Sequence, residues 1–191
     1  MSHATAREIL EHALARRPTL GAGRVVAVDG PSGAGKTTLA AAIEAAAPRH
    51  LDVATLHLDD VYAGWHGLAS LGDDLHGLLT PLAEGRRSTW HTWDWATDSP
   101  GGLREQDPVE LLVLEGVGAG HRQVADLVTL LVWLDGPPDR LDRSLARDVA
   151  RHASAAADAA AYRARLVAWQ QDEAAHYAVD ATRERADIAL G

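Results

Sequence analysis

Short apolar runs alternate with amphipathic stretches along the chain. The runs predict buried strands at 24–29, 52–58, 109–114 and 127–134, with a last short strand at 186–190. Between them, helices are expected at 4–16, 37–47, 71–84, 137–151 and 155–185, the last in one or two pieces. Pro137 is expected in the first turn of its helix, where a missing N–H costs little. Pro81 is expected to limit the helix that contains it.

The organisation of the chain follows from this order. Strands that alternate with helices predict an α/β fold, with a parallel sheet covered by helices on both faces. Segment 86–95 is polar and aromatic and fits neither period well, so it is predicted as a short strand pair. Because no repeat and no linker composition interrupts the chain, residues 1–191 are expected to form one domain.

The amino-acid composition excludes several classes of protein. Of the 191 residues, 47% are hydrophobic and 24% charged, which excludes a mainly disordered chain. No apolar run approaches the ~20 residues that span a bilayer, and the first residues lack the apolar core of a secretion signal. A cytoplasmic location is therefore expected. The absence of cysteine excludes disulfides, thiolate catalysis and zinc–thiolate sites.

The net charge of −9 disfavours nucleic acid and anionic membranes as partners but leaves room for a local cationic pocket. We expect a small-molecule ligand instead, bound by a monomer or a homodimer. One such pocket is suggested by Lys36, the only lysine in the chain.

Lys36 lies in a glycine-rich segment, Gly30-Pro-Ser-Gly-Ala-Gly-Lys-Thr37, which satisfies G-x-x-x-x-G-K-[ST] between a predicted strand and a predicted helix. Its glycines let several backbone N–H groups face one anion, and the helix N-terminus adds its positive end. Lys36 can bridge two phosphates, while the Thr37 hydroxyl can bind Mg²⁺. The pattern predicts that a nucleotide is held by Gly30, Ser32, Gly33, Ala34, Gly35, Lys36, Thr37 and Thr38.

Acidic residues follow two of the other predicted strands. Asp59 and Asp60 come after the second strand, and Glu115 follows the third. Ligands of open α/β sheets lie beyond the carboxyl ends of the strands, where a carboxylate can accept a proton from a hydroxyl or hold Mg²⁺. Either aspartate could be the base, and Glu115 could contact Mg²⁺ or the acceptor. The competing interpretations are a helix cap for the aspartates and an ordinary strand-end acid for Glu115.

Arginines recur at a spacing of three and four in the helix predicted at 137–151. This spacing places Arg140, Arg143 and Arg147 near one face of the helix. Guanidinium groups gathered in this way can stabilise the charge of a transferring phosphoryl group. The alternative is a solvated face paired with Asp139, Asp142 and Asp148.

Aromatic residues cluster between the second and third predicted strands. Three of the six tryptophans lie in Trp90-His-Thr-Trp93-Asp94-Trp95, and Tyr62 and Trp65 precede them. Such rings can stack on a base or a sugar, and Asp94 could bind hydroxyl groups. The same rings could equally be ordinary core.

The sequence resembles P-loop small-molecule and nucleoside kinases of the uridine kinase and phosphoribulokinase type. The matching segments, in the family's order, are GPSGAGKTT at 30–38, DDVY at 59–62, EG at 115–116 and RLDRSLARD at 140–148. The match runs from Arg24 to the C-terminus, including the closing A-D-I-A strand. Val61 stands where the family has Phe, Ser144 where it has a second adjacent Arg, and Trp93-Asp94-Trp95 only loosely resembles its acceptor segment.

This resemblance implies a three-layer P-loop NTPase fold with a five-stranded parallel sheet and a helical lid at about 137–165. It implies ATP and Mg²⁺ as cofactors, with Mg²⁺ near Thr37, Asp59 and Glu115. The implied catalytic residues are Lys36, Asp59, Glu115, Arg143 and Arg147, and Arg140 would assist nucleotide binding. The implied acceptor residues are Asp60, Tyr62, Trp93, Asp94 and Trp95.

The expected activity is transfer of the γ-phosphoryl group of ATP to a small acceptor, a nucleoside or a nucleoside-like hydroxyl. One alternative is a nucleoside monophosphate kinase of the (d)CMP type, since the opening Val28-Asp29-Gly30-Pro31-Ser32 also resembles cytidylate kinases. Its anionic acceptor would need a basic pocket, for which Arg86, Arg87 and Arg104 are the candidates. Another is a nucleotide-binding regulator without an acceptor. An acceptor cavity beside Asp59 would separate these classes.

Overall fold

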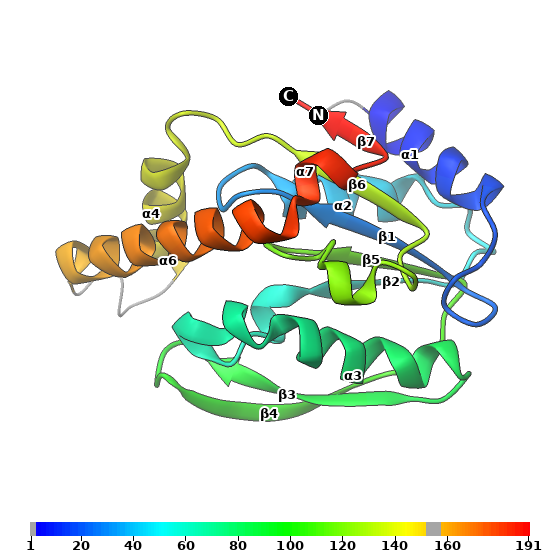
Figure 1. The fold of residues 1–191 in the computed structure, drawn as a ribbon, viewed down its shortest axis with the longest axis horizontal. Coiled ribbons are helices and arrows are strands. Elements are labelled where there is room, and N and C mark those ends of the chain that lie inside the picture. Colours follow the sequence, from blue (N-terminus) through cyan, green and yellow to red (C-terminus); the bar gives the residue numbers. More distant parts are fainter. Residues whose placement is uncertain (1–2, 152–157) are drawn as a thin grey trace.

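The computed structural model describes residues 3–151 and 158–191. Its centre is a parallel five-stranded sheet in the order β2-β5-β1-β6-β7 (Figure 1). Along the chain the strands are β1 (Arg24–Asp29), β2 (Val53–His57), β5 (Leu111–Glu115), β6 (Leu130–Leu134) and β7 (Ile188–Leu190). The predicted parallel sheet is therefore confirmed, and every one of its strands overlaps a predicted one.

Alternate residues of the strands face opposite sides of the sheet, which explains why the central strands are apolar throughout. On one side, Val26, Val113 and Val132 pack with α1 (His3–Ala15) and α2 (Lys36–Ala46). On the other, Ala27, Leu112 and Leu131 pack with α3 (Leu71–Ala83). Helices on both faces give the three-layer fold that the sequence predicted (Figure 1).

The C-terminal part of the described chain is helical. After β6 come α4 (Arg140–Arg151), α6 (Ala159–Asp180) and α7 (Thr182–Arg185), and α4 packs against α6. Asp158 caps α6 by accepting a hydrogen bond from the Ala161 N–H. The lid predicted at 137–165 corresponds to α4 and the start of α6, but residues 152–157 lie outside the described part of the chain.

Segment 86–95 is not a strand pair by itself, so that prediction was wrong. It forms a single strand, β3 (Ser88–Asp94), which pairs antiparallel with β4 (Ser99–Gln106). Strand β4 carries Pro, two Gly and several polar residues, and it is mostly exposed, so no apolar alternation marks it in the sequence. The hairpin lies against α3 on the side away from the sheet (Figure 1).

One expectation about proline was confirmed and one was wrong. Helix α3 includes Pro81 and ends two residues later, at Ala83, so the proline limits the helix without breaking it. Pro137 does not lie inside its helix: α4 begins at Arg140, whose N–H donates to the Pro137 carbonyl.

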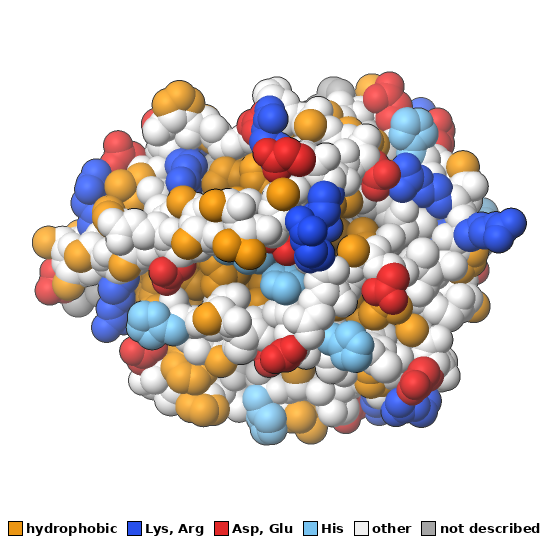
Figure 2. Space-filling model, in the orientation of Figure 1, with side chains coloured by type: hydrophobic (Ala, Val, Ile, Leu, Met, Phe, Trp, Pro, Cys, Tyr) orange, Lys and Arg blue, Asp and Glu red, His pale blue; other side chains and the backbone are white. Residues whose placement is uncertain are grey.

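Short 3₁₀ helices complete the fold at η1 (Leu58–Asp60), η2 (Gly64–Ala69) and η3 (Arg122–Val124). Within residues 3–151 and 158–191, no helix combines the length and apolar character needed to cross a bilayer. Figure 2 shows hydrophobic side chains gathered in a recess beneath α6, while Lys and Arg are scattered over the rest of this face.

Candidate active site

The candidate site lies at the carboxyl edge of the sheet, where three strands end side by side. Val28 in β1 and His57 in β2 both pair with Glu115, the last residue of β5. The loop after β1, the turn after β2 and the end of β5 therefore meet at one place. This is the edge at which open α/β sheets bind ligands.

The loop after β1 has the backbone that its glycines predict. Gly30, Gly33 and Gly35 have φ angles of 142°, 81° and 100°, a region that other residues rarely adopt. A Cβ on Gly30 would lie 2.2 Å from the Leu134 carbonyl oxygen, and one on Gly33 would lie 2.7 Å from the Arg140 carbonyl oxygen. Gly35 then caps α2, so the N-terminus of this helix opens at the loop.

Lys36 folds back over this loop. Its ammonium donates to the carbonyl oxygens of Gly30 at 2.7 Å and Pro31 at 3.1 Å. The side chain is buried, and this desolvation lowers the pKa of Lys36, while Glu115 and Asp29 act in the opposite direction. The lysine is therefore held as a local cation where the loop N–H groups and the helix N-terminus also favour an anion.

Asp29, the last residue of β1, holds two loops together. Its buried carboxylate accepts from the N–H groups of Gly30 at 2.6 Å, Gly118 at 2.9 Å and Gly120 at 2.8 Å, and from the Tyr177 hydroxyl at 2.8 Å. This network joins the glycine-rich loop, the segment after β5 and helix α6, and so it is structural.

Glu115 is bound by two neighbours. One of its oxygens lies 2.6 Å from His57 Nδ1 and accepts a hydrogen bond from the Thr37 hydroxyl at 3.1 Å. The hydrogen bond to Glu115 raises the pKa of His57. A metal pair of His57 with Asp59 had little support in the sequence, and only the strand register shows that His57 pairs with Glu115 instead.

Mg²⁺ prefers hydroxyl and carboxylate oxygens, and it keeps waters and binds substrate phosphates where few carboxylates are present. The Thr37 hydroxyl and the Glu115 carboxylate supply oxygens of this kind beside the loop. In the described residues, no three His, Asp or Glu side chains are grouped to hold a metal alone. The site therefore fits a Mg²⁺ ion that arrives with a nucleotide.

The turn after β2 presents Asp59 and Asp60 to the same space. Indole N–H groups from the hairpin fix its backbone, because Trp90 donates to the Asp60 carbonyl at 3.1 Å and Trp95 donates to the Asp59 carbonyl at 3.0 Å. Neither aspartate caps a helix through its side chain. The Asp59 side chain remains accessible from the cavity, although protein surrounds it closely. This loss of bulk water, together with Glu115, raises the pKa of Asp59.

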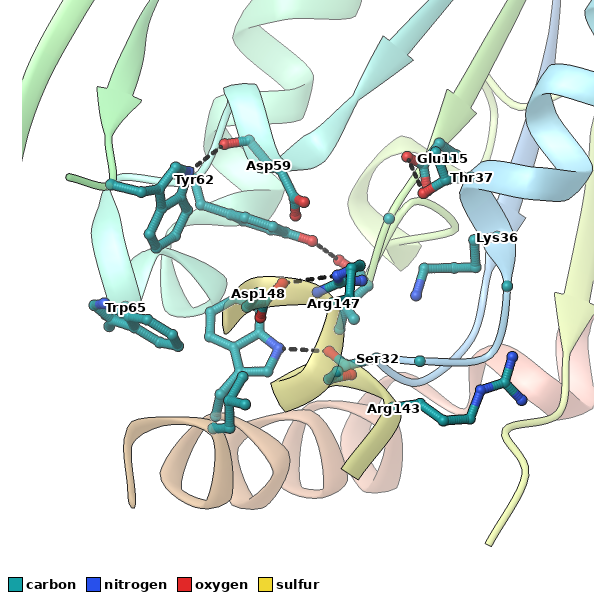
Figure 3. A pocket seen from close by; sticks show the side chains of 18 of the residues that line it. Ser32, Lys36, Thr37, Asp59, Tyr62, Trp65, Glu115, Arg143, Arg147 and Asp148 are labelled. Carbon is teal, nitrogen blue, oxygen red and sulfur yellow. Dashed lines mark hydrogen bonds and ion pairs between the residues drawn. The ribbon is translucent and has the colours of Figure 1, made fainter. Parts of the chain in front are cut away.

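These elements enclose a cavity of ≈570 Å³. Figure 3 shows the Asp59 carboxylate and the Lys36 ammonium entering it from opposite sides. The lining has a phosphate end and an aromatic end. The phosphate end consists of Ser32, Gly33, Gly35, Lys36, Thr37, Thr38 and Glu115. The aromatic end contains Tyr62, Trp65, Trp95, Tyr162 and Trp169 beside Asp59 and Asp60.

The aromatic rings pack edge to face. Trp65 is T-shaped against Trp95 at 5.5 Å, Tyr162 at 5.4 Å and Trp169 at 6.4 Å between ring centroids. The Tyr62 hydroxyl donates to the Val117 carbonyl at 2.8 Å, which fixes its ring. Contacts of this kind build a rigid wall that suits the face of a flat or ring-shaped ligand.

The three arginines of α4 have different surroundings. Arg143 and Arg147 line the cavity, and Arg147 donates to Asp148 at 2.7 Å. Arg140 does not line it and instead pairs with Glu173 of α6 at 2.9 Å. Within the described chain, the Arg143 guanidinium has no hydrogen bond or ion pair. The three arginines of α4 therefore form neither a purely solvated face nor one group that points toward a single ligand.

Several other predicted residues lie elsewhere. Gly30 and Ala34 belong to the loop but do not line the cavity. Trp93 and Asp94 also lie outside its lining, which corrects their expected placement beside Trp95. Asp94 serves the hairpin turn, where it accepts hydrogen bonds from the N–H groups of Ala96 and Thr97 and from the Thr97 hydroxyl. Alternation along the strand places Asp94 on the opposite face from Trp93, and Trp95 lies beyond the end of β3, so the three residues do not share one direction.

Sequence reasoning missed the contribution of α6. Tyr162, Leu166 and Trp169 line the cavity, and Glu173 lies just behind the loop. The helical spacing of Leu166, Trp169 and Glu173 is visible in the sequence, but it does not indicate that these residues meet at the loop.

No protein-family model matches this sequence, and no curated protein matches it significantly. Solved structures do. The fold is similar to that of a "possible uridine kinase" from Bacillus stearothermophilus, with 20% identity, 100% of both chains covered and a TM-score of 0.67. It is also similar to a "putative fructose transport system kinase" from Silicibacter sp. TM1040, with 23% identity, 100% of both chains covered and a TM-score of 0.65.

This chain shares the fold of these two structures, a parallel five-stranded sheet between layers of helices. The resemblance drawn from the four sequence segments is thereby confirmed at the level of the fold.

Proposed function

We propose that this protein is an ATP-dependent phosphotransferase that moves the γ-phosphoryl group of ATP to a hydroxyl of a small acceptor, a nucleoside or a nucleoside-like compound. One observation carries the proposal: a single cavity holds the phosphate-binding loop at one end and the Asp59 turn with its aromatic wall at the other. A phosphoryl donor and a ring-bearing acceptor could therefore be held next to each other in one cavity, as in-line transfer requires.

The roles follow from the positions of the side chains. The loop N–H groups and Lys36 bind the phosphates, and Thr37 and Glu115 would hold Mg²⁺. The ion, when bound, neutralises charge on the phosphates. Asp59 orients the acceptor hydroxyl and takes its proton, and the raised pKa of Asp59 favours that uptake. Arg143 and Arg147 stabilise the charge of the transferring group.

The cavity does not favour the alternative of a nucleoside monophosphate kinase. Its anionic acceptor would need cations beyond Arg143 and Arg147, which are assigned to the transferring group, yet Arg86, Arg87 and Arg104 do not line the cavity. Arg86 pairs with Glu84, and Arg87 pairs with Glu105 and Asp107 on the exposed hairpin. Asp59 and Asp60 would in addition repel a phosphate. An uncharged acceptor is the better match.

A regulator that binds a nucleotide without an acceptor would need no second compartment. The space beside Asp59, walled by aromatic rings, therefore supports the enzyme over the regulator.

The experiment that tests the proposal is a screen for ADP release with Mg·ATP and single acceptors. Nucleosides, nucleoside monophosphates and small sugars form three arms at equal concentration. We expect release with a member of the nucleoside arm and none above background with the monophosphates. ADP release that no acceptor increases, together with normal ATP binding, would favour the regulator instead.

A further inference from the structure

A partly buried hydrogen-bond network joins helix α6 to the phosphate-binding loop. Ser32 lies at its centre. The Ser32 N–H donates to Glu173 Oε1 at 3.0 Å, and the Ser32 hydroxyl donates to the same oxygen. The hydroxyl oxygen also accepts from the Trp169 indole N–H at 3.1 Å, a contact visible in Figure 3. Ser32 is thus fixed by two side chains of one helix.

Glu173 is only 1% exposed and does not line the cavity, so it supports the loop from behind. Its second oxygen accepts from Arg140 Nη1 at 2.9 Å. Loss of the partners of a buried carboxylate strongly destabilises the folded protein. The Glu173 carboxylate therefore holds the loop, α4 and α6 together.

Trp169 belongs to both ends of the cavity. Its ring packs T-shaped on Tyr62 at 5.1 Å and on Trp65 at 6.4 Å, in the aromatic wall. Its N–H reaches Ser32 of the loop. Since the indole is rigid and 7% exposed, a ligand that shifts the ring must also shift the hydrogen bond to Ser32.

We propose that Trp169 couples the aromatic end of the cavity to the phosphate-binding loop through Ser32, and that Glu173 is the positioning residue that holds Ser32 for this purpose. The proposal rests on nucleotide binding at the loop, the first step of the proposed function. Coupling between sites is reciprocal. A ligand at the aromatic wall therefore changes nucleotide affinity by the same factor by which the nucleotide changes the affinity for that ligand.

A double-mutant cycle with Mg·ADP as the probe tests the shared hydrogen bond. Trp169→Phe removes the N–H and keeps a ring, and Ser32→Ala removes the hydroxyl. We expect each variant to weaken Mg·ADP binding by about fivefold or more, the lower end of typical coupling. The double variant should bind within about twofold of Ser32→Ala, because Ser32→Ala already removes the acceptor of the Trp169 N–H together with the hydroxyl's hydrogen bond to Glu173. Independent, multiplying effects, or no effect of either change, would overturn the proposal.

Trp133→Phe is the matched control. It removes an indole hydrogen bond of 2.7 Å to Asp135 outside the cavity, and it should leave the affinity for Mg·ADP unchanged. Glu173→Gln tests the positioning role, because an amide can still accept from Ser32 but cannot pair with Arg140. We expect the Glu173→Gln dissociation constant for Mg·ADP to rise, and an unchanged value would remove Glu173 from the proposal.

A second readout does not depend on affinity. Protein labelled with 5-fluorotryptophan gives ¹⁹F resonances, among which that of Trp169 is assigned with Trp169→Phe. Mg·ADP should shift the Trp169 resonance in the wild-type protein and shift it much less in Ser32→Ala. An equal shift in both proteins would indicate direct contact with the nucleotide and overturn the coupling. If Mg·ADP binds but the Trp169 resonance does not shift, the coupling is overturned and the proposed function is not. If Mg·ADP does not bind at all, the proposed function is overturned as well.

Discussion

The Lys36 ammonium donates a 2.7 Å hydrogen bond to the carbonyl oxygen of Gly30, six residues earlier in the chain. The only lysine of the protein thus closes the loop that it belongs to, at the edge where three strands end. An incoming phosphate would compete with backbone carbonyls for the Lys36 ammonium. Burial lowers the pKa of Lys36, and an anionic partner would counteract this by stabilising the charged form of the side chain.

We expect Lys36→Ala to weaken ATP binding or turnover by at least ~100-fold, because charge on the phosphates dominates phosphoryl transfer. Isothermal titration with Mg·ATP measures the first quantity and ADP release the second. Lys36→Met, which keeps most of the length and apolar volume, should behave like Lys36→Ala. Unchanged affinity together with unchanged turnover in both variants would contradict the assignment.

Asp59→Asn is expected to lower kcat by ~10²–10⁴-fold with little effect on ATP affinity, since a base acts on the acceptor hydroxyl in the transition state. Asp60→Asn is the matched control on the neighbouring residue and should cost much less. Activity of each variant is measured across a Mg²⁺ titration, because a metal-binding role for Asp59 would appear there. If Asp60→Asn shows the large loss of kcat and Asp59→Asn does not, Asp60 rather than Asp59 is the base.

Arg143→Ala should reduce acceptor-dependent kcat by about 10²-fold, the usual cost of losing one donor to a developing charge. It should leave the free energy of unfolding nearly unchanged, because the Arg143 guanidinium has no partner in the described chain. We expect Arg147→Ala to lower both quantities, since Arg147 also pairs with the buried Asp148. Arg163→Ala, which breaks an exposed pair with Asp142 away from the cavity, is the control. Wild-type kcat in both Arg143→Ala and Arg147→Ala would show that neither arginine has a catalytic role.

His176 makes stability depend on pH. Its Nε2 is buried without a partner among the described residues, and burial lowers the pKa of His176, with the stacked His121 and Arg185 acting in the same direction and Asp29 and Asp180 opposing it. The unfolded chain therefore binds more protons near this residue than the folded chain does. Its contribution to stability is present above pH 6.5 and is lost as the pH falls through the lowered value.

Urea denaturation of wild type and His176→Gln at pH 7.5 and 5.5 measures this contribution. We expect the variant to lose less stability than wild type between the two pH values. The comparison is made between variants because His57, with its raised pKa, contributes with the opposite sign in the same range. Equal losses in both proteins would rule out His176 as the source.

Much of the fold was predictable from the chain alone. The apolar runs at 24–29 and 109–114 form strands β1 and β5, whose residues are almost all buried, and such runs need no tertiary information to be recognised. The loop at Gly30–Thr37 was predictable for the same reason, because its glycines, lysine and helix start lie within eight consecutive residues. Strand β4 was not predictable, since its exposed Pro, Gly and charged residues carry no alternation and its pairing with β3 alone defines it.

The sequence by itself determined the elements whose signal is local: the buried strands and the glycine-rich loop between a strand and a helix. Only the tertiary structure decided which distant residues meet. It brought His57 to Glu115 through strand register, Glu173 and Trp169 to Ser32 across more than a hundred residues, and it left Trp93 and Asp94 outside the cavity. The reason is physical: periodicity specifies which face of an element is buried, whereas the packing of whole elements decides what that face contacts.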